Sequence, residues 1–117
     1  MPSSLQIGRA AEALAANHLI ERGATLLHRN YRYGRTEVDL IAQQAQILLF
    51  VEVKARKNDH FGWPETFVTD AQQSRIQAAA EHYLLTHRWP HAIRFDIIAV
   101  CLAVRGMPQI TYFEDAF

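Results

Sequence analysis

The stretch that decides the fold runs from Thr36 to Ala55 and reads TEVDLIAQQAQILLFVEVKA. Polar and apolar residues alternate over TEVDLIAQ (36–43), and the same alternation follows an apolar start in QILLFVEVKA (46–55). Alternation with a period of two predicts two strands, and the short interval between them leaves room only for a tight turn. The stretch therefore predicts an antiparallel hairpin whose turn centres between Ala45 and Gln46.

This turn fixes which residues lie opposite one another in the hairpin. One side of the hairpin is predicted to carry all four of its charged residues, in the pairs Asp39–Glu52 and Glu37–Lys54, together with the apolar pair Ile41–Phe50. The other side is predicted to be an apolar core face, with the pairs Val38–Val53, Leu40–Val51 and Ala42–Leu49. A register shifted by one residue would place Asp39 and Glu52 on opposite faces.

Two carboxylates directly across a strand pair have Cβ atoms roughly 5 Å apart, and their like charges destabilise the sheet unless something compensates. Asp39 and Glu52 could hold Mg²⁺ or Mn²⁺, which prefer oxygen ligands, while Lys54 lies about 7 Å further along the same face. A bound metal acidifies water and stabilises charge on a phosphate, and the lysine can orient the nucleophile. The alternative is an exposed hairpin with an ordinary Glu37–Lys54 salt bridge.

The rest of the chain predicts a single α/β domain over residues 1–117, with a mixed sheet flanked by helices. A helix starts at Ser3 or Ser4, with Gln6 completing a capping box, and ends near Arg22 before Gly23. Asp70 is the predicted N-cap of a second helix that runs to about Arg88, with Gln73 at the capping-box position. Strands are predicted over 24–32, 93–104 and 109–115, the last at a sheet edge.

The composition is that of a soluble globular protein, with 50% hydrophobic and 21% charged residues. No apolar run approaches the roughly 20 residues that a membrane span needs, and the N-terminus lacks a secretory signal, so we expect a cytoplasmic location and no membrane partner. The single cysteine, Cys101, lies in an apolar run and is predicted to be a core residue. The formal net charge is zero, which counts against tight unaided nucleic-acid binding.

Several basic and acidic residues leave two interpretations open. Three arginines recur at three-residue spacing, at Arg29, Arg32 and Arg35, and two more basic residues, Arg56 and Lys57, follow the suspected site. These residues are either phosphate contacts or solvated charge. The phosphate-contact candidates are Arg32, Arg35, Arg56 and Lys57. Glu12 lies in a stripe of small and apolar residues on the first helix, where a carboxylate either meets a partner or sits at a partly solvated edge.

Two further groups of residues are predicted to be structural. Asp96, inside an apolar strand, is either a group behind the site or a hydrogen-bonded strand residue. His82, His87 and His91 have no recognised zinc spacing and are assigned to the surface.

Five segments together resemble the YraN family of small bacterial proteins. In chain order they are GRAAEALAANHLIERG (8–23), RNYRYGRTEVDLIA (29–42), LLFVEVKAR (48–56), FGWPETFV (61–68) and RFDIIAV (94–100). The resemblance extends from about Ile7 to Val100. That family is similar to Holliday-junction resolvases and, by fold, to the PD-(D/E)XK restriction-endonuclease-like superfamily, which implies an α-β-β-β-α-β core.

The resemblance also implies roles for individual residues. It assigns the superfamily's aspartate to Asp39, its E-x-K to Glu52 and Lys54, and the first-helix glutamate of the resolvase-like branch to Glu12. Mg²⁺ or Mn²⁺ would then be held by Glu12, Asp39 and Glu52, and Glu37 is an accessory ligand. This chain departs from the family pattern at Thr36, where glycine is usual, and at Gln72, where the second helix often carries a lysine.

These observations lead to two expectations of different kinds. The first is a metal-dependent endonuclease that hydrolyses phosphodiester bonds in structured or branched DNA, engaging duplex DNA as a homodimer. The second is a module that keeps the nuclease fold but only binds nucleic acid or a protein partner. The segment FGWPETF (61–67) is interpreted as a dimer surface, a substrate-facing loop, or a loop that caps the core.

Overall fold

A computed structural model describes residues 3–56, 68–102 and 106–117. The predicted order α-β-β-β-α-β-β is confirmed. The elements are α1 (Ser4–Glu21), β1 (Thr25–Tyr33), β2 (Thr36–Gln44), β3 (Ile47–Arg56), α2 (Asp70–His87), β4 (Ala92–Cys101) and β5 (Gln109–Phe113). Lys57 and the FGWPETF segment (61–67) lie outside the described residues. No helix in the described ranges combines the length and the apolar character that crossing a membrane demands.

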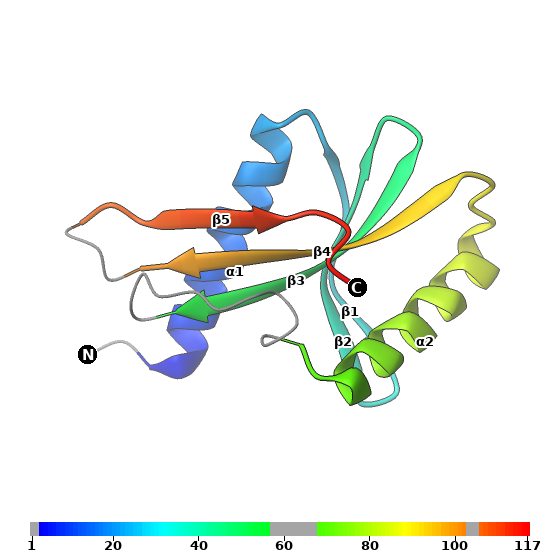
Figure 1. The fold of residues 1–117 in the computed structure, drawn as a ribbon, viewed down its shortest axis with the longest axis horizontal. Coiled ribbons are helices and arrows are strands. Elements are labelled where there is room, and N and C mark those ends of the chain that lie inside the picture. The colour runs from blue at the N-terminus through cyan, green and yellow to red at the C-terminus, as the bar shows by residue number, and fades with distance from the viewer. Residues whose placement is uncertain (1–2, 57–67, 103–105) are drawn as a thin grey trace.

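The five strands form one mixed sheet in the order β1-β2-β3-β4-β5 (Figure 1). The first three form the predicted antiparallel meander, whereas β3 and β4 are parallel and are joined through α2. β5 pairs antiparallel with β4 and lies at the edge, as predicted. The architecture is therefore an α-β-β-β-α-β core with an additional edge strand.

Each face of the sheet is covered by one helix, and each helix closes its own core. The core under α1 includes Ala11, Ala15, Ala16, Leu19, Leu40, Ala42, Leu49, Val51, Ile98 and Val100. The core under α2 includes Val38, Ile41, Leu48, Phe50, Ile76, Ala79, Tyr83, Ile97 and Ala99. Ile41 and Phe50 are fully buried, so the side of the hairpin that was predicted to carry the charges is an apolar core over half its length.

The two long helices begin at capping boxes, one of which the sequence misplaced. Ser3 caps α1, and its side chain and that of Gln6 bond reciprocally to the backbone, as predicted. The N-cap of α2 is Thr69 rather than Asp70, and its capping-box partner is Gln72 rather than Gln73. Thr69 and Asp70 are both good capping residues in sequence, but Thr69 alone has the extended backbone of a cap here.

β1 breaks its alternation at a bulge between Leu26 and His28 and again at Asn30, where β2 breaks its own alternation opposite, at Asp39. His28 pairs with Ile41, and Tyr31 pairs with Val38. All four lie on the α2 side, although the two residues on each strand are three positions apart. Asn30 adopts a left-handed backbone with φ 54°, which asparagine tolerates better than most residues. The sheet is therefore irregular at Asn30 and Asp39.

This irregularity corrects the predicted face of the hairpin. Val38 was expected beside Leu40 on one apolar face, but Val38 packs under α2 and Leu40 under α1. The predicted register itself is confirmed from Gln44–Ile47 to Leu40–Val51, around a turn at Ala45 and Gln46. The ladder ends there, so the predicted pairs Asp39–Glu52, Glu37–Lys54 and Val38–Val53 do not form.

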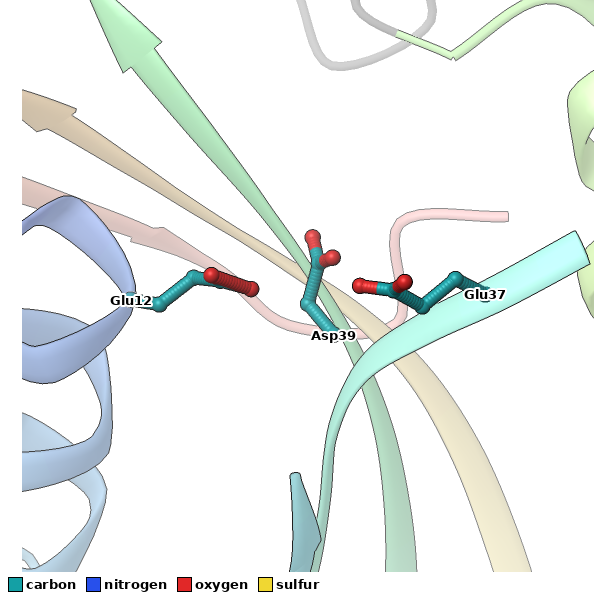
Figure 2. A group of neighbouring side chains, drawn as sticks. All are labelled: Glu12, Glu37 and Asp39. Carbon is teal, nitrogen blue, oxygen red and sulfur yellow. The ribbon is translucent and has the colours of Figure 1, made fainter. Parts of the chain in front are cut away.

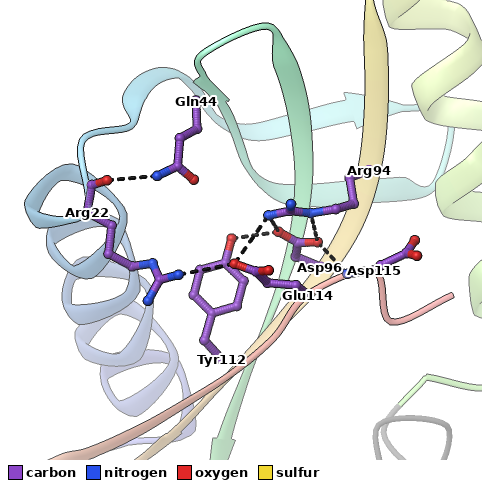
Figure 3. A network of polar contacts seen from close by, with 7 residues as sticks. All are labelled: Arg22, Gln44, Arg94, Asp96, Tyr112, Glu114 and Asp115. Atoms are coloured by element: carbon purple, nitrogen blue, oxygen red, sulfur yellow. Dashed lines mark hydrogen bonds and ion pairs between the residues drawn. The ribbon is translucent and has the colours of Figure 1, made fainter.

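Among the described residues, Asp96 is the charged residue that is fully buried in the core. It accepts two hydrogen bonds from the Arg94 guanidinium, at 2.8 and 2.9 Å, and one from the Tyr112 hydroxyl at 2.6 Å. The backbone N–H of Asp115 donates a further bond at 2.9 Å (Figure 3). Asp96 therefore joins β4 to β5 and to the C-terminal segment. Of its two predicted roles, it has that of a hydrogen-bonded strand residue.

Candidate metal centre

Three carboxylates from two elements converge where β2 separates from β3. Glu12 projects from α1, Glu37 and Asp39 project from β2, and one oxygen of each lies within 4.8 Å of the others (Figure 2). All three side chains are half-buried. We call these three residues the acidic centre.

Asn30 holds two members of the acidic centre in place. Its side-chain amide donates hydrogen bonds to Glu12 Oε1 at 2.8 Å and to Glu37 Oε1 at 2.6 Å. The left-handed backbone at Asn30 breaks the strand at the position from which this amide reaches α1 and β2 together. Glu37 also forms an ion pair of 3.3 Å with Arg32, whose side chain is 73% exposed.

Asp39 replaces part of the missing strand ladder. The backbone N–H of Val53 donates a hydrogen bond of 2.8 Å to Asp39 Oδ2, so the side chain takes the place of a strand carbonyl. Burial first, and then a hydrogen bond with the Glu52 carboxyl and its negative charge, raise the pKa of Asp39 to about 9. Without a cation, the Asp39–Glu52 pair therefore favours holding a proton.

The pKa of Glu12 is also raised, mainly by burial and further by the charges of Asp39 and Glu37. The hydrogen bond from Asn30 and the charge of Arg29 oppose this rise. Both shifts have the sign expected of carboxylates that are crowded together without enough positive charge.

In the part of the chain that the structure describes, several cavities border the acidic centre, and each is lined by two arginines. One of about 320 Å³ is lined by Leu5, Arg9, Glu12, Asn30, Arg32 and Glu37, and two others lie on opposite sides of the sheet. Of these two, the first, of about 150 Å³, lies on the α2 side and is lined by Arg35, Thr36, Glu37, Glu52, Gln72, Arg75 and Ile76. The second, of about 260 Å³, lies on the α1 side and is lined by Arg9, Glu12, Arg29, Asn30, Asp39 and Leu40. We call them the Arg35–Arg75 cavity and the Arg9–Arg29 cavity.

The donor set of the acidic centre fits a hard divalent cation. Mg²⁺ binds oxygen at about 2.1 Å, so ligands on opposite sides of the ion are about 4.2 Å apart. Oxygens already within 4.8 Å of one another need only small side-chain movements to reach this spacing. A cation would also offset the burial and the crowded negative charge that raise the pKa of Asp39 and of Glu12.

The other predicted site residues lie close by, but outside the acidic centre. Glu52 lines the Arg35–Arg75 cavity next to Asp39, and Lys54 follows it by two residues on the same face of β3. Gln72 lines the same cavity, although its side-chain oxygen is engaged in the capping box of α2. Arg35 lines this cavity too, and Arg56 lies at the end of β3 and contacts the Ala55 carbonyl.

The sequence did not single out Asn30, Arg9 or Arg75. Asparagine is unfavourable inside a strand, so Asn30 within an otherwise strand-like segment was a signal that something other than strand pairing keeps it there. Arg9 precedes Glu12 by three residues, and Arg75 follows Gln72 by three, so each lies one helical turn from a residue that was singled out. That spacing could have identified both arginines.

The fold and the site together define a small α/β protein with an arginine-flanked acidic centre. The chain belongs to the family described as "uncharacterised protein family UPF0102", whose model matches residues 11–100, and the resemblance to the YraN family is thereby confirmed. The matched range contains Glu12, Glu37, Asp39, Glu52 and Lys54.

Relatives of similar length cover nearly the whole chain. A UPF0102 protein of Anaeromyxobacter dehalogenans is 43% identical over 112 residues, which are 95% of this chain and 83% of the relative. A UPF0102 protein of Rhodococcus opacus is 39% identical over 119 residues and covers both chains completely. A third, from Shewanella putrefaciens, is 43% identical over 111 residues, with 95% and 98% coverage.

Proposed function

We propose that this protein is a metal-dependent endonuclease that hydrolyses phosphodiester bonds in structured or branched DNA. The observation that carries the proposal is the convergence of three carboxylates, whose oxygens lie within 4.8 Å of one another. Glu52 lies beside them on β3, the strand that also bears Lys54. Carboxylates of this number and spacing are the ligands that Mg²⁺ and Mn²⁺ prefer. The family model covers these residues, because all of them lie within the matched range 11–100.

Each residue of the site has a distinct task in this proposal. Glu12 and Asp39 hold the ion, with Glu37 or Glu52 completing the set, and Asn30 keeps Glu12 and Glu37 apart and oriented. When bound, the ion acidifies water and stabilises negative charge on the phosphate. Lys54 orients the attacking water and neutralises charge in the transition state.

The arginines around the acidic centre provide local positive charge, although the formal net charge of the chain is zero. Arg35 and Arg75 lie on the α2 side of the acidic centre, and Arg9 and Arg29 lie on the α1 side. Guanidinium groups bind phosphate bidentately, so a backbone that crosses the centre meets a pair of arginines on each side. Arg75 also places a cation one turn away from Gln72, where the family often has lysine.

The proposal is tested by cleavage of junction, flap and blunt duplex DNA with Mg²⁺ or Mn²⁺. We expect wild type to cut, and Asp39→Ala and Lys54→Ala to lower the rate at least about 100-fold. Glu81→Ala, which removes an exposed acid on α2 outside both cavities, should keep the wild-type rate. Equal trace activity in wild type and in the Asp39→Ala and Lys54→Ala variants would show that a contaminating nuclease is responsible.

The second candidate function is a module that binds nucleic acid or a protein partner without turnover. Two observations favour it: the formal net charge of zero, and the use of the Gln72 oxygen as a helix cap instead of a substrate contact. This function predicts DNA or protein binding that survives Asp39→Ala, with no metal-dependent cleavage of any DNA structure.

Calorimetric titration with Mg²⁺ or Mn²⁺ separates the two functions before any substrate is chosen. The nuclease proposal expects one site in wild type and its loss in Asp39→Asn. The same titration of Glu81→Gln should match wild type. Absence of metal binding by wild type would leave only the binding module.

A further inference from the structure

We propose that Tyr33 and His82 form a stacking platform for an unpaired nucleobase, next to the Arg35–Arg75 cavity. The inference rests on the proposed function and deepens it, because it assigns the substrate class: DNA in which at least one nucleotide beside the scissile phosphate is unpaired.

Tyr33 and His82 present an exposed aromatic surface. Their ring centroids lie 4.6 Å apart at an interplanar angle of 30°. Tyr33 is 43% exposed, and His82 is exposed on α2. Stacking on an aromatic side chain is how proteins hold single-stranded bases without reading their sequence.

A buried aromatic layer holds this surface rigid. The Tyr31 hydroxyl and His82 Nδ1 are hydrogen-bonded at 2.7 Å, which fixes the imidazole ring. Tyr31 packs edge-on against Tyr83, with centroids 5.2 Å apart, and Tyr83 contacts Phe50 in the core under α2. A base that stacks on Tyr33 therefore meets a ring whose support is already ordered, and this lowers the entropy cost of binding.

The platform is joined directly to the cavity by the chain itself. Tyr33 is followed by the turn at Gly34 and Arg35, and Arg35 and Thr36 line the cavity that contains Glu37. On the facing helix, Arg75 lines the cavity and His82 lies seven residues later on the same side of α2, about 10 Å along the axis. Three nucleotides at about 3.4 Å each cover this distance.

The guanidiniums of Arg35 and Arg75 next to the aromatic platform favour a nucleic-acid strand as the occupant. Neither Arg35 nor Arg75 forms an ion pair with another residue in the ranges that the structure describes. The two guanidiniums can therefore take backbone phosphates while the base rests on Tyr33. An apolar peptide would leave both charges unmatched.

The test measures binding in EDTA, so that it does not depend on cleavage. A duplex with a short single-stranded overhang and a blunt duplex of the same sequence are titrated by fluorescence anisotropy. We expect wild type to prefer the overhang, and Tyr33→Ala to weaken overhang binding about tenfold while leaving blunt-duplex binding unchanged. Tyr33→Phe keeps the ring and should bind as wild type does.

A second readout separates base stacking from a structural role of Tyr33. With 2-aminopurine in the overhang, wild type and Tyr33→Phe should quench its fluorescence at one position, and Tyr33→Ala should not. Leu85→Ala removes another exposed side chain of α2, which is 81% exposed, and should change neither readout. Thermal unfolding of each variant verifies that the fold is intact.

The outcomes for the platform and for the nuclease are distinguishable. Equal overhang affinity in wild type and Tyr33→Ala overturns the platform, even if the protein cuts DNA with Mg²⁺. The Tyr33→Ala defect without any cleavage supports the platform and overturns the nuclease. Arg75→Ala should weaken both DNAs alike and reduce the salt dependence by about one phosphate contact; no effect of Arg75→Ala on either DNA would contradict the assigned path of the strand.

Discussion

Asp39 combines a structural task with the proposed catalytic one. As a hydrogen-bond acceptor for Val53 N–H it closes the gap where β2 leaves β3. As a half-buried acid next to Glu52 it has a pKa of about 9 against an ordinary value of 3.8. The folded, metal-free protein therefore keeps this proton over a pH range in which the unfolded chain has lost it.

This difference predicts that the metal-free protein loses stability as pH rises from about 4 to about 9. Over that range the folded state binds one proton more than the unfolded state, so the free energy of unfolding falls by at most about 1.4 kcal/mol per pH unit. Asp39→Asn cannot titrate and should lack this part of the fall. Thermal unfolding in EDTA at pH 5 and pH 8.5 should show the variant gaining stability relative to wild type at the higher pH.

Leu85→Ala provides the control for this pH profile, because Leu85 is 81% exposed on α2 and carries no titratable group. Its profile should run parallel to that of wild type. A parallel profile for Asp39→Asn as well would contradict the raised pKa of Asp39. Metal binding requires the ionised carboxylate, so Mg²⁺ affinity of wild type should rise with pH over the same range.

Asn30 supports a second prediction at the residue scale, because its backbone and its side chain can be tested separately. Asn30→Gly keeps a residue that accepts φ 54° but removes the amide that binds Glu12 and Glu37. Asn30→Ala removes the amide and also forces alanine into the left-handed region, at a cost of about 1 kcal/mol more. Urea unfolding should rank wild type above the glycine variant and the glycine variant above alanine; equal stability of the two variants would show that the left-handed backbone is not retained.

At the scale of the element, the start of α2 discriminates between neighbouring capping residues. Thr69→Ala should cost about 1 kcal/mol of stability, since the Thr69 side chain accepts from Gln72 N–H at 3.2 Å. Asp70→Ala should cost less, because Asp70 acts only through its charge in the first turn. Urea unfolding of both variants at moderate salt measures the difference, and the reverse order would restore Asp70 as the cap.

The hairpin of β2 and β3 shows why an element can be predicted while its end cannot. Alternation and the turn at Ala45 and Gln46 determine the register near the turn, and five residue pairs there follow it. Beyond Leu40 and Val51 the register depends on the left-handed residue in β1, which is a different strand. The pattern of β2 and β3 alone contains no information about such a break, because its cause is the partner strand and the helix above it.

At the scale of the whole molecule, the network around Asp96 ties the far end of the fold together. Arg22 at the end of α1 pairs with Glu114 at 3.1 Å, Glu114 also lies 3.7 Å from Arg94, and Gln44 donates to the Arg22 carbonyl (Figure 3). Glu12 precedes Arg22 by ten residues, or about 15 Å along the helix. The network thus stabilises the structure at a distance from the acidic centre.

Removing one partner of an ion pair in this network should lower the stability of the protein more when that ion pair is more deeply buried. Arg94→Met leaves the Asp96 carboxylate buried without its cation and should destabilise the protein by about 3 kcal/mol. Arg22→Met breaks a pair whose side chains are 43% and 48% exposed, and should cost about 1 kcal/mol or less. Urea unfolding measures both, and similar losses would mean that Asp96 is not the centre of the network.

The sequence by itself determined the order of the elements and the register next to the β2–β3 turn, and it singled out the three carboxylates of the acidic centre. These follow from hydrophobic period, from turn and capping residues and from the spacing of charged side chains, all of which act between near neighbours in the chain. The single cysteine and the buried Asp96 also took the structural roles that their apolar surroundings favoured.

Only the tertiary structure decided how those residues meet. Asp39 does not face Glu52 across a ladder; it lies beside Glu12 and Glu37, with Asn30 between the two glutamates. The arginines on either side come from α1, β1, the β1–β2 turn and α2. The physical reason is that a paired break in two strands, and a helix laid across it, set these distances. Such contacts join residues far apart in sequence, and no local pattern encodes them.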